Sequence, residues 1–218
     1  MIGCVPVRYD GILPAANCQR PFWAKLIFAF DSWLQRRGGV FKYSEKSDCI
    51  FRLQLRRLSS GVVLSDGTCG HPGDRVVDLH LWNEQIPAAP KAGDTLGWGR
   101  RFDRRISESL RGLAHFLESR SELSDVQIIR ASINLEFLVC IAVRHGFERA
   151  CGSVEPSTWE CVNQFGENVL HWLLAAACNP YGARPKFWRR RQLLYLSRRI
   201  LTRDARVPAI MGSRDRPR

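Results

Sequence analysis

The chain has 218 residues, of which 45% are hydrophobic and 25% are charged, and its formal net charge at pH 7 is +12. This length suits one domain. The hydrophobic content is sufficient for a buried core, which excludes an intrinsically disordered chain. The charge is uneven, because residues 184–218 hold 12 Lys or Arg and two Asp, a net of +10, and leave the rest of the chain nearly neutral.

An amphipathic helix is the first element that the sequence predicts, within the apolar run of residues 22–34. The apolar residues that share one helical face are Trp23, Ile27, Phe30 and Leu34. We expect this face to pack on the core, and an interfacial membrane helix is the alternative. The run is shorter than the roughly 20 residues that a spanning helix needs, and no secretory cleavage site follows it.

Strands are predicted next. Residues 49–56 alternate between apolar and polar side chains, as a half-buried strand does, and residues 62–64 form a short strand. Asp66-Gly67 is a hairpin turn signal, because Gly accepts a positive φ. Residues 75–81 are a strand with Val77, Leu79 and Leu81 on one face. The short connections predict an antiparallel meander.

Helices follow these strands. Residues 87–99 are expected to form a loop, and residues 101–119 an amphipathic helix with apolar residues at spacings of three and four. A strand is expected over residues 126–132, and a buried helix over residues 133–145 that stops near Gly146. Two further helices are predicted, one with Ser157 as its N-cap and a final one defined by Leu193, Leu196, Ile200 and Leu201.

Together these elements predict an α+β fold, in which a small antiparallel β-meander packs against several helices and a basic helix and tail end the chain. The expected organisation is a flexible N-terminus over residues 1–20, one domain over residues 21–206 and a disordered basic tail over residues 207–218.

A candidate site lies at the end of the strand over residues 75–81. Asp78, His80, Trp82 and Glu84 share one strand face, and Asn83 lies between the last two. A carboxylate beside imidazole fixes its tautomer, so His80 with Asp78 or Glu84 is a candidate acid/base pair. The alternative is a polar network that caps the strand end, with Asn83 bonding loop backbone.

An aromatic residue in the following segment is a second candidate for this site. Trp98 is flanked by Gly97 and Gly99, and we expect such a loop to place the indole near His80, where it stacks on a sugar. The alternative is a buried Trp in a Gly-flanked turn. The candidate ligand-binding residues are therefore His80, Trp82, Asn83, Glu84 and Trp98.

The C-terminal basic segment is a candidate binder of phosphate groups, because it interleaves aromatic side chains with arginines. The residues assigned to membrane or phosphate binding are Lys186, Arg189, Arg190, Arg191 and Arg198. Anionic lipid and nucleic acid both offer phosphates, and a helix whose arginine stems cover apolar surface is the structural alternative. No helix-turn-helix, RRM or KH signature supports nucleic acid.

The eight cysteines are scattered, and no pair has CxxC spacing. We expect eight free thiols, a reducing compartment, no metal site and no cofactor.

The order of motifs resembles that of the YkoP-like domain family. An arginine-rich strand precedes Leu64-Ser-Asp-Gly-Thr68 and Gly73-Asp74, and an acidic residue then precedes Leu79-His-Leu-Trp-Asn-Glu84. Arg144-His-Gly-Phe-Glu148 and Leu196-Ser-Arg-Arg199 also resemble family segments. Asp78 stands where the family usually has glutamate, and Trp82 where a less bulky residue is usual.

The resemblance implies a bacterial envelope context, since such domains occur alone, behind polysaccharide deacetylase domains and near glycosyltransferases. We therefore expect a cytoplasmic accessory domain, peripheral to the inner membrane, that binds anionic lipid or a phosphorylated or lipid-linked sugar. An envelope glycosyltransferase or deacetylase is the expected protein partner. The alternatives are a small enzyme on such a substrate, with His80 as acid/base, and a nucleic-acid-binding protein.

Overall fold

The computed structural model describes residues 22–82, 85, 95–133, 136–149, 169, 173 and 191–206. Within these residues the helices are α1 (Phe22–Arg37), α2 (Thr95–Ser119), the 3₁₀ turn η2 (Ser121–Leu123), α3 (Glu136–Arg144) and α5 (Arg198–Arg206). The strands are β1 (Phe51–Arg57), β2 (Val62–Val63), β3 (Cys69–Gly70), β4 (Arg75–Leu81), β5 (Ile128–Ile133) and β6 (Gln192–Ser197). Both termini and the predicted Ser157 helix fall outside the described residues, apart from Val169 and Leu173.

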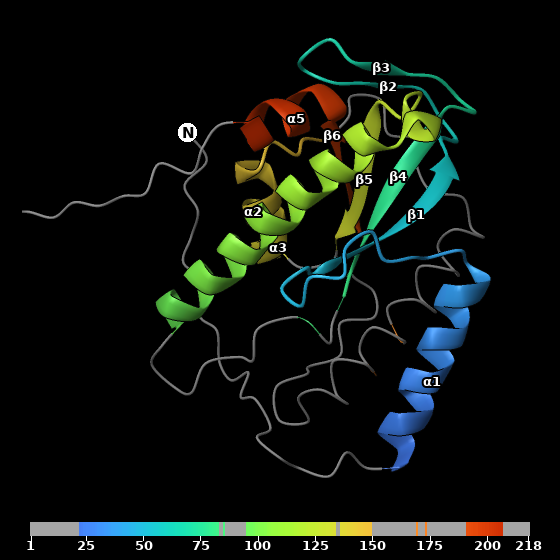
Figure 1. Cartoon of the computed structure of the whole chain (residues 1–218), viewed down its shortest axis with the longest axis vertical. Coiled ribbons are helices and arrows are strands. Elements are labelled where there is room, and N and C mark those ends of the chain that lie inside the picture. Colours follow the sequence, from blue (N-terminus) through green and yellow to red (C-terminus); the bar gives the residue numbers. More distant parts are fainter. Residues whose placement is uncertain are drawn as a thin grey trace, which may run out of the picture.

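A four-stranded sheet in the order β1-β4-β5-β6 forms the centre of the fold (Figure 1). β1 and β4 are antiparallel, as are β5 and β6, but β4 and β5 are parallel. The α+β class is therefore confirmed, whereas a purely antiparallel meander is wrong. The parallel pair arises because α2 carries the chain back along the sheet between β4 and β5, which is the crossover that parallel neighbours require.

The predicted final helix is wrong in its first half. Residues 192–197 form β6, and a helix begins only at Arg198. A short apolar run cannot be assigned to helix or strand from periodicity alone, and here the backbone pairing with β5 decides for the strand. Ser197 ends that strand and caps α5, since its hydroxyl oxygen accepts a hydrogen bond from the backbone N–H of Ile200 at 3.1 Å.

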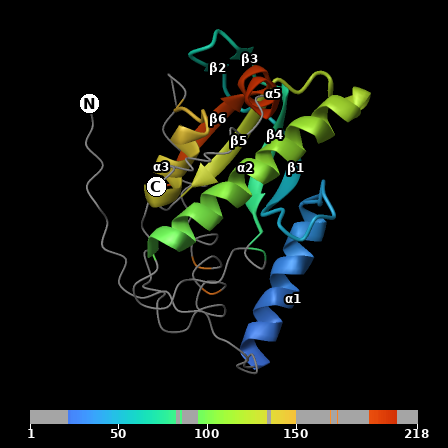
Figure 2. The same cartoon turned by 60° about the vertical axis from the view of Figure 1, so that its left-hand side comes forward.

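Helices α2, α3 and α5 cover one face of the sheet, as Figures 1 and 2 show. The predicted apolar stripe of α2 is buried there and consists of Phe102, Ile106, Leu110, Leu113 and Leu117. It packs on alternate residues of the strands, among them Leu53, Val77 and Ile129. The helix begins at Thr95, so the predicted loop over residues 87–99 is wrong for its last five residues.

The hairpin of β2 and β3 packs over one end of the opposite face of the sheet. Gly67, in its turn, has φ +83°, which confirms the turn predicted at Asp66-Gly67. Apolar side chains of the hairpin and the sheet form a second buried cluster of Leu58, Val62, Leu64, Val76, Ile128 and Tyr195. A Cβ on Gly70 would lie 2.5 Å from the Ile128 side chain, so glycine allows this close packing.

Polar contacts fasten the hairpin to β6. The Asp66 carboxylate accepts hydrogen bonds from the Ser197 hydroxyl at 2.6 Å and from the Thr68 backbone N–H at 3.0 Å. Glu148 accepts from the Ser65 backbone N–H at 2.8 Å. Two of the family-like segments, Leu64–Thr68 and Leu196–Arg199, therefore meet in a structural contact.

Asp66 is expected to make folding stability fall in acid. Burial raises the pKa of this carboxyl, but the hydrogen bonds from Ser197 and Thr68 outweigh it and hold the pKa below its ordinary value of 3.8. A lowered folded-state pKa adds stability that is present above pH 3.8 and is lost as the pH falls through the lowered pKa.

We therefore expect Asp66→Asn to lower the free energy of unfolding by about 1.5 kcal/mol at neutral pH, and by less as acid protonates the wild-type carboxyl. Chemical denaturation at a series of pH values measures this difference. Glu122→Gln, at an exposed carboxyl, is the matched control and should show little effect. A difference that stays constant into strong acid would contradict the assignment.

Within the described residues, each outer strand of the sheet has one short additional pairing. Phe41 exchanges two backbone hydrogen bonds with Leu53 of β1, at 2.8 and 2.9 Å. Glu148 does the same with Tyr195 of β6, at 2.8 Å in both directions.

The α1 helix confirms the helix predicted over residues 22–34, whereas the predicted buried face is buried only in part. Ile27 and Leu34 are half-buried, whereas Phe30, which was expected on the buried face, is 52% exposed. The consequences of this exposure are developed below.

Candidate functional site

A row of polar side chains crosses the sheet on the face opposite α2. Gln54 of β1 faces Asp78 of β4, Asp78 faces Arg130 of β5, and Arg130 faces Tyr195 of β6. Alternation places these four residues on one face and the core-forming residues on the other. We call this surface, with Arg52 and His80 in the next register position, the polar sheet face.

Asp78 and Arg130 form the central contact of the polar sheet face. Arg130 donates from Nε to Asp78 Oδ1 and from its terminal nitrogen to Oδ2, both at 2.7 Å, and each side chain is 15% exposed. Such a bidentate pair is a strong charge-assisted contact. Burial acts to lower the pKa of Arg130, but the hydrogen bonds and charge of Asp78 outweigh it and raise that pKa. Burial raises the pKa of the neighbouring Tyr195.

His80 lies one register step further along β4 and is exposed. Its Nε2 is 3.1 Å from Oε1 of Gln54. An amide oxygen only accepts hydrogen bonds, so His80 Nε2 is the donor. Gln54 is itself fixed, because its amide nitrogen donates to the backbone oxygen of Gly38 and its oxygen also accepts from Arg56 Nε at 2.9 Å.

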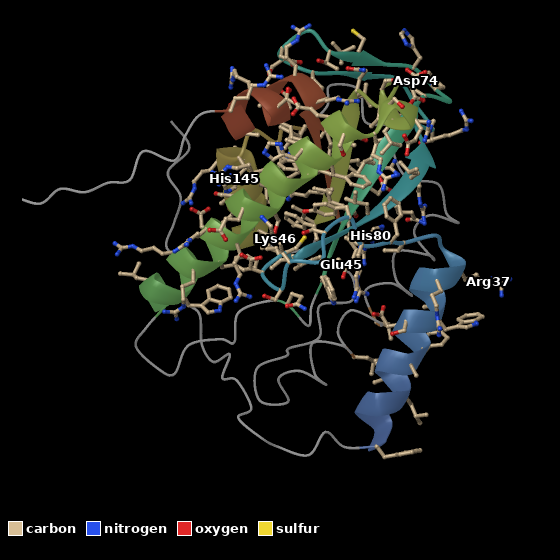
Figure 3. All side chains as sticks on the ribbon, in the orientation of Figure 1. Arg37, Glu45, Lys46, Asp74, His80 and His145 are labelled. Carbon is tan, nitrogen blue, oxygen red and sulfur yellow. The ribbon has the colours of Figure 1, made fainter. Side chains whose placement is uncertain are left out.

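The predicted pairing of His80 with Asp78 is therefore not what the structure shows. Asp78 commits both carboxylate oxygens to Arg130, and His80 bonds an amide instead of that carboxylate. Asn83 and Glu84 lie outside the described residues. Figure 3 shows His80 at the end of the sheet that lies near the C-terminal end of α1.

Trp82 lies just beyond the end of β4, and two cationic side chains lie over its ring. The Nζ of Lys42 and the Cζ of Arg52 each lie 4.4 Å from the centroid of its ring. The backbone N–H of Trp82 donates to the carbonyl of Ile50 at 2.7 Å, which holds the residue beside β1. Cations at this distance are attracted by the ring's quadrupole. We call Lys42, Arg52 and Trp82 the Trp82 cluster.

Sequence reasoning missed Lys42 and Arg52, although one signal for Arg52 was present. Arg52, Gln54 and Arg56 alternate with apolar residues in β1, and antiparallel pairing with β4 brings Arg52 opposite His80. Lys42 lies outside any regular strand, so its position depends on tertiary packing.

Trp98 does not join this site. It lies in the first turns of α2 and stacks on Phe102, with ring centroids 5.2 Å apart and an interplanar angle of 8°. It packs against the core on the helix-covered face, whereas His80 projects from the other face. The expected Gly-flanked loop beside His80 is wrong, because Gly97 and Gly99 are inside a helix.

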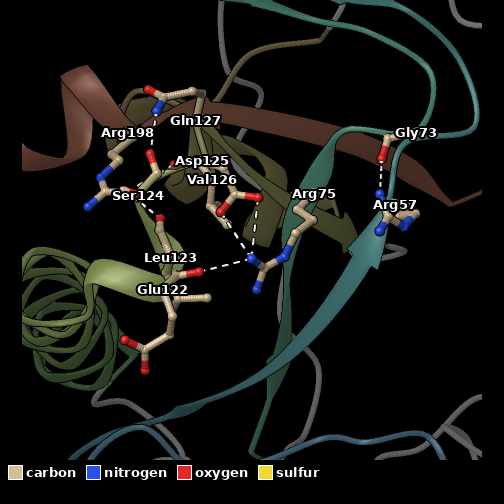
Figure 4. A network of polar contacts seen from close by, with 10 residues as sticks. All are labelled: Arg57, Gly73, Arg75, Glu122, Leu123, Ser124, Asp125, Val126, Gln127 and Arg198. Atoms are coloured by element: carbon tan, nitrogen blue, oxygen red, sulfur yellow. Dashed lines mark hydrogen bonds and ion pairs between the residues drawn. The ribbon is translucent and has the colours of Figure 1, made fainter.

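Of the residues predicted to bind phosphate, the structure describes Arg191 and Arg198. Arg198 donates to the backbone oxygens of Leu123 at 2.6 Å, Leu117 at 2.7 Å and Val126 at 3.2 Å. Figure 4 shows it in a network of polar contacts that also includes Arg75. Its guanidinium therefore ties α5 to the end of α2 instead of facing a ligand. Lys186, Arg189 and Arg190 lie outside the described residues, and Arg191 precedes β6.

A small cavity of about 130 Å³ lies between α2, α5 and the end of α3. It is lined by Ser107, Leu110, Arg111, His145, Leu201, Asp204 and Ala205. His145 Nε2 is 3.1 Å from Asp103 Oδ1, to which Arg144 also pairs at 2.8 Å. Sequence reasoning did not anticipate this His–Asp contact, which depends on the packing of α3 against α2. The volume is below the roughly 300 Å³ typical of ligand pockets.

The sequence predicts free thiols, no metal site and no membrane-spanning helix. Among the described residues, Cys49, Cys69 and Cys140 are free thiols, and no group of three potential metal ligands occurs. The other five cysteines lie outside this part of the chain. Within the same residues, no helix is both long enough and apolar enough to cross a bilayer.

The chain was compared with known proteins and protein families. No curated protein and no solved structure matches the chain. Among protein families, the YkoP domain matches residues 22–201, which extend from the first residue of α1 into α5. Since this match spans most of the sequence, the chain belongs to the YkoP domain family.

Proposed function

We propose that this protein is a ligand-binding accessory domain of bacterial envelope metabolism, which recognises a phosphorylated or lipid-linked sugar through the Trp82 cluster and His80. The observation that carries the proposal is the pair of cations, Lys42 and Arg52, held 4.4 Å from the Trp82 ring centroid. The envelope context is supported by the resemblance of the motifs to those of the family.

Local charge favours an anion at this site. Lys42 and Arg52 are positive, and the exposed His80 stands opposite Arg52 in the strand register. The carboxylate of Asp78 is paired with Arg130, so its charge is compensated within the sheet. Cations presented by an aromatic ring have little freedom to lose on binding, which favours affinity for phosphate.

The same geometry favours recognition of the phosphate over stacking on the sugar ring. The indole of Trp82 already contacts two cations, and Trp98, the other aromatic candidate, packs in the core. We therefore propose that the phosphate or diphosphate of the ligand lies between Lys42 and Arg52. In this arrangement the sugar extends toward His80, whose ring is oriented by the hydrogen bond from its Nε2 to Gln54.

Titration with glucose 1-phosphate, followed by calorimetry, tests this proposal. Lys42→Gln/Arg52→Gln should weaken binding by about tenfold or more, because two charge-assisted contacts are lost. Lys46→Gln/Arg57→Gln removes two exposed charges outside the Trp82 cluster and is the matched control, which should bind as the wild type does. Glucose without phosphate should not bind.

Three outcomes would contradict the proposal. Equal affinity of the test and control variants would show that the Trp82 cluster does not hold the ligand. Hydrolysis of the phosphate ester by the wild type, with loss of turnover in His80→Gln, would instead show an enzyme with His80 as acid/base. Tight retention on RNA in place of sugar phosphate would favour the nucleic-acid alternative.

A further inference from the structure

Helix α1 presents a continuous apolar stripe to solvent. Phe22, Leu26, Phe30 and Trp33 recur at spacings of four, four and three residues, which places them on one helical face. Their exposed fractions are 76%, 55%, 52% and 46%. Phe30 and Trp33 stack on each other with ring centroids 5.9 Å apart. Four large exposed apolar side chains in one row indicate an interaction surface.

An adjacent face of α1 faces the protein. Ile27 and Leu34 lie on that face and are half-buried. The helix therefore has two apolar faces, and only one of them packs against the rest of the protein within the described residues. A helix that serves the core alone has a polar outer face, so the exposed stripe has a separate role.

Two arginines mark the C-terminal end of this stripe. Arg37 lies over the ring of Trp33, with Cζ 5.4 Å from the centroid, and Arg36 donates from Nε to the Ser32 carbonyl at 3.3 Å. Both contacts are within α1, so the two charges stay next to the apolar stripe. Aromatic and aliphatic side chains flanked by arginine match the boundary between acyl chains and anionic headgroups.

We infer that α1 docks on an anionic lipid bilayer, with Phe22, Leu26, Phe30 and Trp33 in the interface and Arg36 and Arg37 at the lipid phosphates. A helix of 16 residues is about 24 Å long, shorter than the roughly 30 Å hydrocarbon core, so it lies in the membrane plane. The positive charge at its end complements anionic lipid headgroups.

Docking would also orient the polar sheet face. Gly38 directly follows α1, and its backbone oxygen accepts a hydrogen bond from Gln54, which in turn bonds His80. The candidate anion site therefore lies beside the end of the helix that would contact headgroups. This inference deepens the proposed function by naming the membrane as the source of the ligand, but the docking of α1 does not require that the site binds sugar.

Vesicle co-sedimentation tests the inference with vesicles of phosphatidylcholine alone or mixed with phosphatidylglycerol. Leu26→Glu/Phe30→Glu should reduce binding to the mixed vesicles by about tenfold or more, because burial of two large apolar side chains is lost. Arg36→Glu/Arg37→Glu should weaken binding to mixed vesicles and remove its dependence on salt. Leu96→Glu/Val143→Glu, at exposed apolar positions of α2 and α3, is the matched control and should bind normally.

Three further measurements separate docking of α1 from loss of the fold and from loss of the sugar site. The substituted side chains are exposed, so thermal unfolding of the α1 variants should match that of the wild type. Glucose 1-phosphate titration of Leu26→Glu/Phe30→Glu should also be unchanged, because those side chains are not in the Trp82 cluster. Hydrogen exchange of the wild type should show slower exchange over residues 22–37 when mixed vesicles are added.

The inference is overturned if Leu26→Glu/Phe30→Glu binds mixed vesicles as tightly as the wild type. Equal binding of the wild type to neutral and mixed vesicles would also overturn it, because the arginines would then have no role. A wild-type dimer that Leu26→Glu/Phe30→Glu converts to a monomer, without vesicle binding by either, would assign the stripe to self-association.

Discussion

Asp78→Ala is expected to lower the free energy of unfolding by about 3 kcal/mol, because it leaves the Arg130 guanidinium charged and without its bidentate partner. Arg130 is 15% exposed, so water compensates for the lost carboxylate only in part. The pKa of Arg130 is raised in the folded state, and it stays charged at every accessible pH. Chemical denaturation at neutral pH measures the loss.

A double-mutant cycle gives the control for this prediction. Asp78→Leu/Arg130→Leu removes both charges together and should be less destabilised than the sum of the two single changes. The pair of Arg75 and Asp125, at 3.0 Å but with side chains 31% and 51% exposed, offers a matched comparison. Breaking it should cost less than about 1 kcal/mol. Additive effects at Asp78 and Arg130 would show that their contact contributes nothing.

Arg198→Ala is the second large expected effect, again about 3 kcal/mol of unfolding free energy, because three backbone carbonyls lose a charged donor. Arg198→Lys should recover little of it, since a single ammonium cannot reproduce the fork that reaches Leu117 and Leu123. Arg199→Ala, at the next position and exposed, is the matched control and should be nearly neutral.

Vesicle binding decides between the two roles considered for Arg198. If its contacts are structural, Arg198→Ala should unfold at a lower temperature but bind mixed vesicles normally below that temperature. Loss of vesicle binding with unchanged stability would return Arg198 to the phosphate-binding role that the sequence predicted.

Helices and strands with a clear hydrophobic period could be predicted from the sequence. Elements that depend on partners distant in the sequence could not. The α2 stripe and the alternation of β1 and β4 are local patterns, and both occur where expected. Residues 192–197 are a strand because β5 supplies a backbone partner, which a run of Leu and Tyr cannot reveal. The parallel pairing of β4 with β5 likewise depends on how the chain returns after α2.

The candidate site was predictable to the same extent. Alternation places Asp78 and His80 on one face, as expected, but not the partners that they find there. Arg130 is 52 positions from Asp78, and Gln54 is 26 positions from His80, so only the register of β1, β4 and β5 brings them together. Trp98 was misplaced because its flanking glycines favour a loop, whereas stacking on Phe102, four residues later, is compatible with a helix.

The short backbone pairings of Phe41 with β1 and of Glu148 with β6 protect the edge strands of the sheet against aggregation. A strand with unpaired N–H and C=O groups along its outer side is a template for another chain, and β1 and β6 both occupy such positions. Phe41 engages Leu53 on one margin, and Glu148 engages Tyr195 on the other. Each pairing occupies backbone N–H and C=O groups near the middle of the outer strand. A second molecule therefore cannot add an uninterrupted strand along either edge of the sheet. With β1 beside the candidate anion site, this protection keeps intermolecular strand addition away from the surface that is proposed to bind ligand.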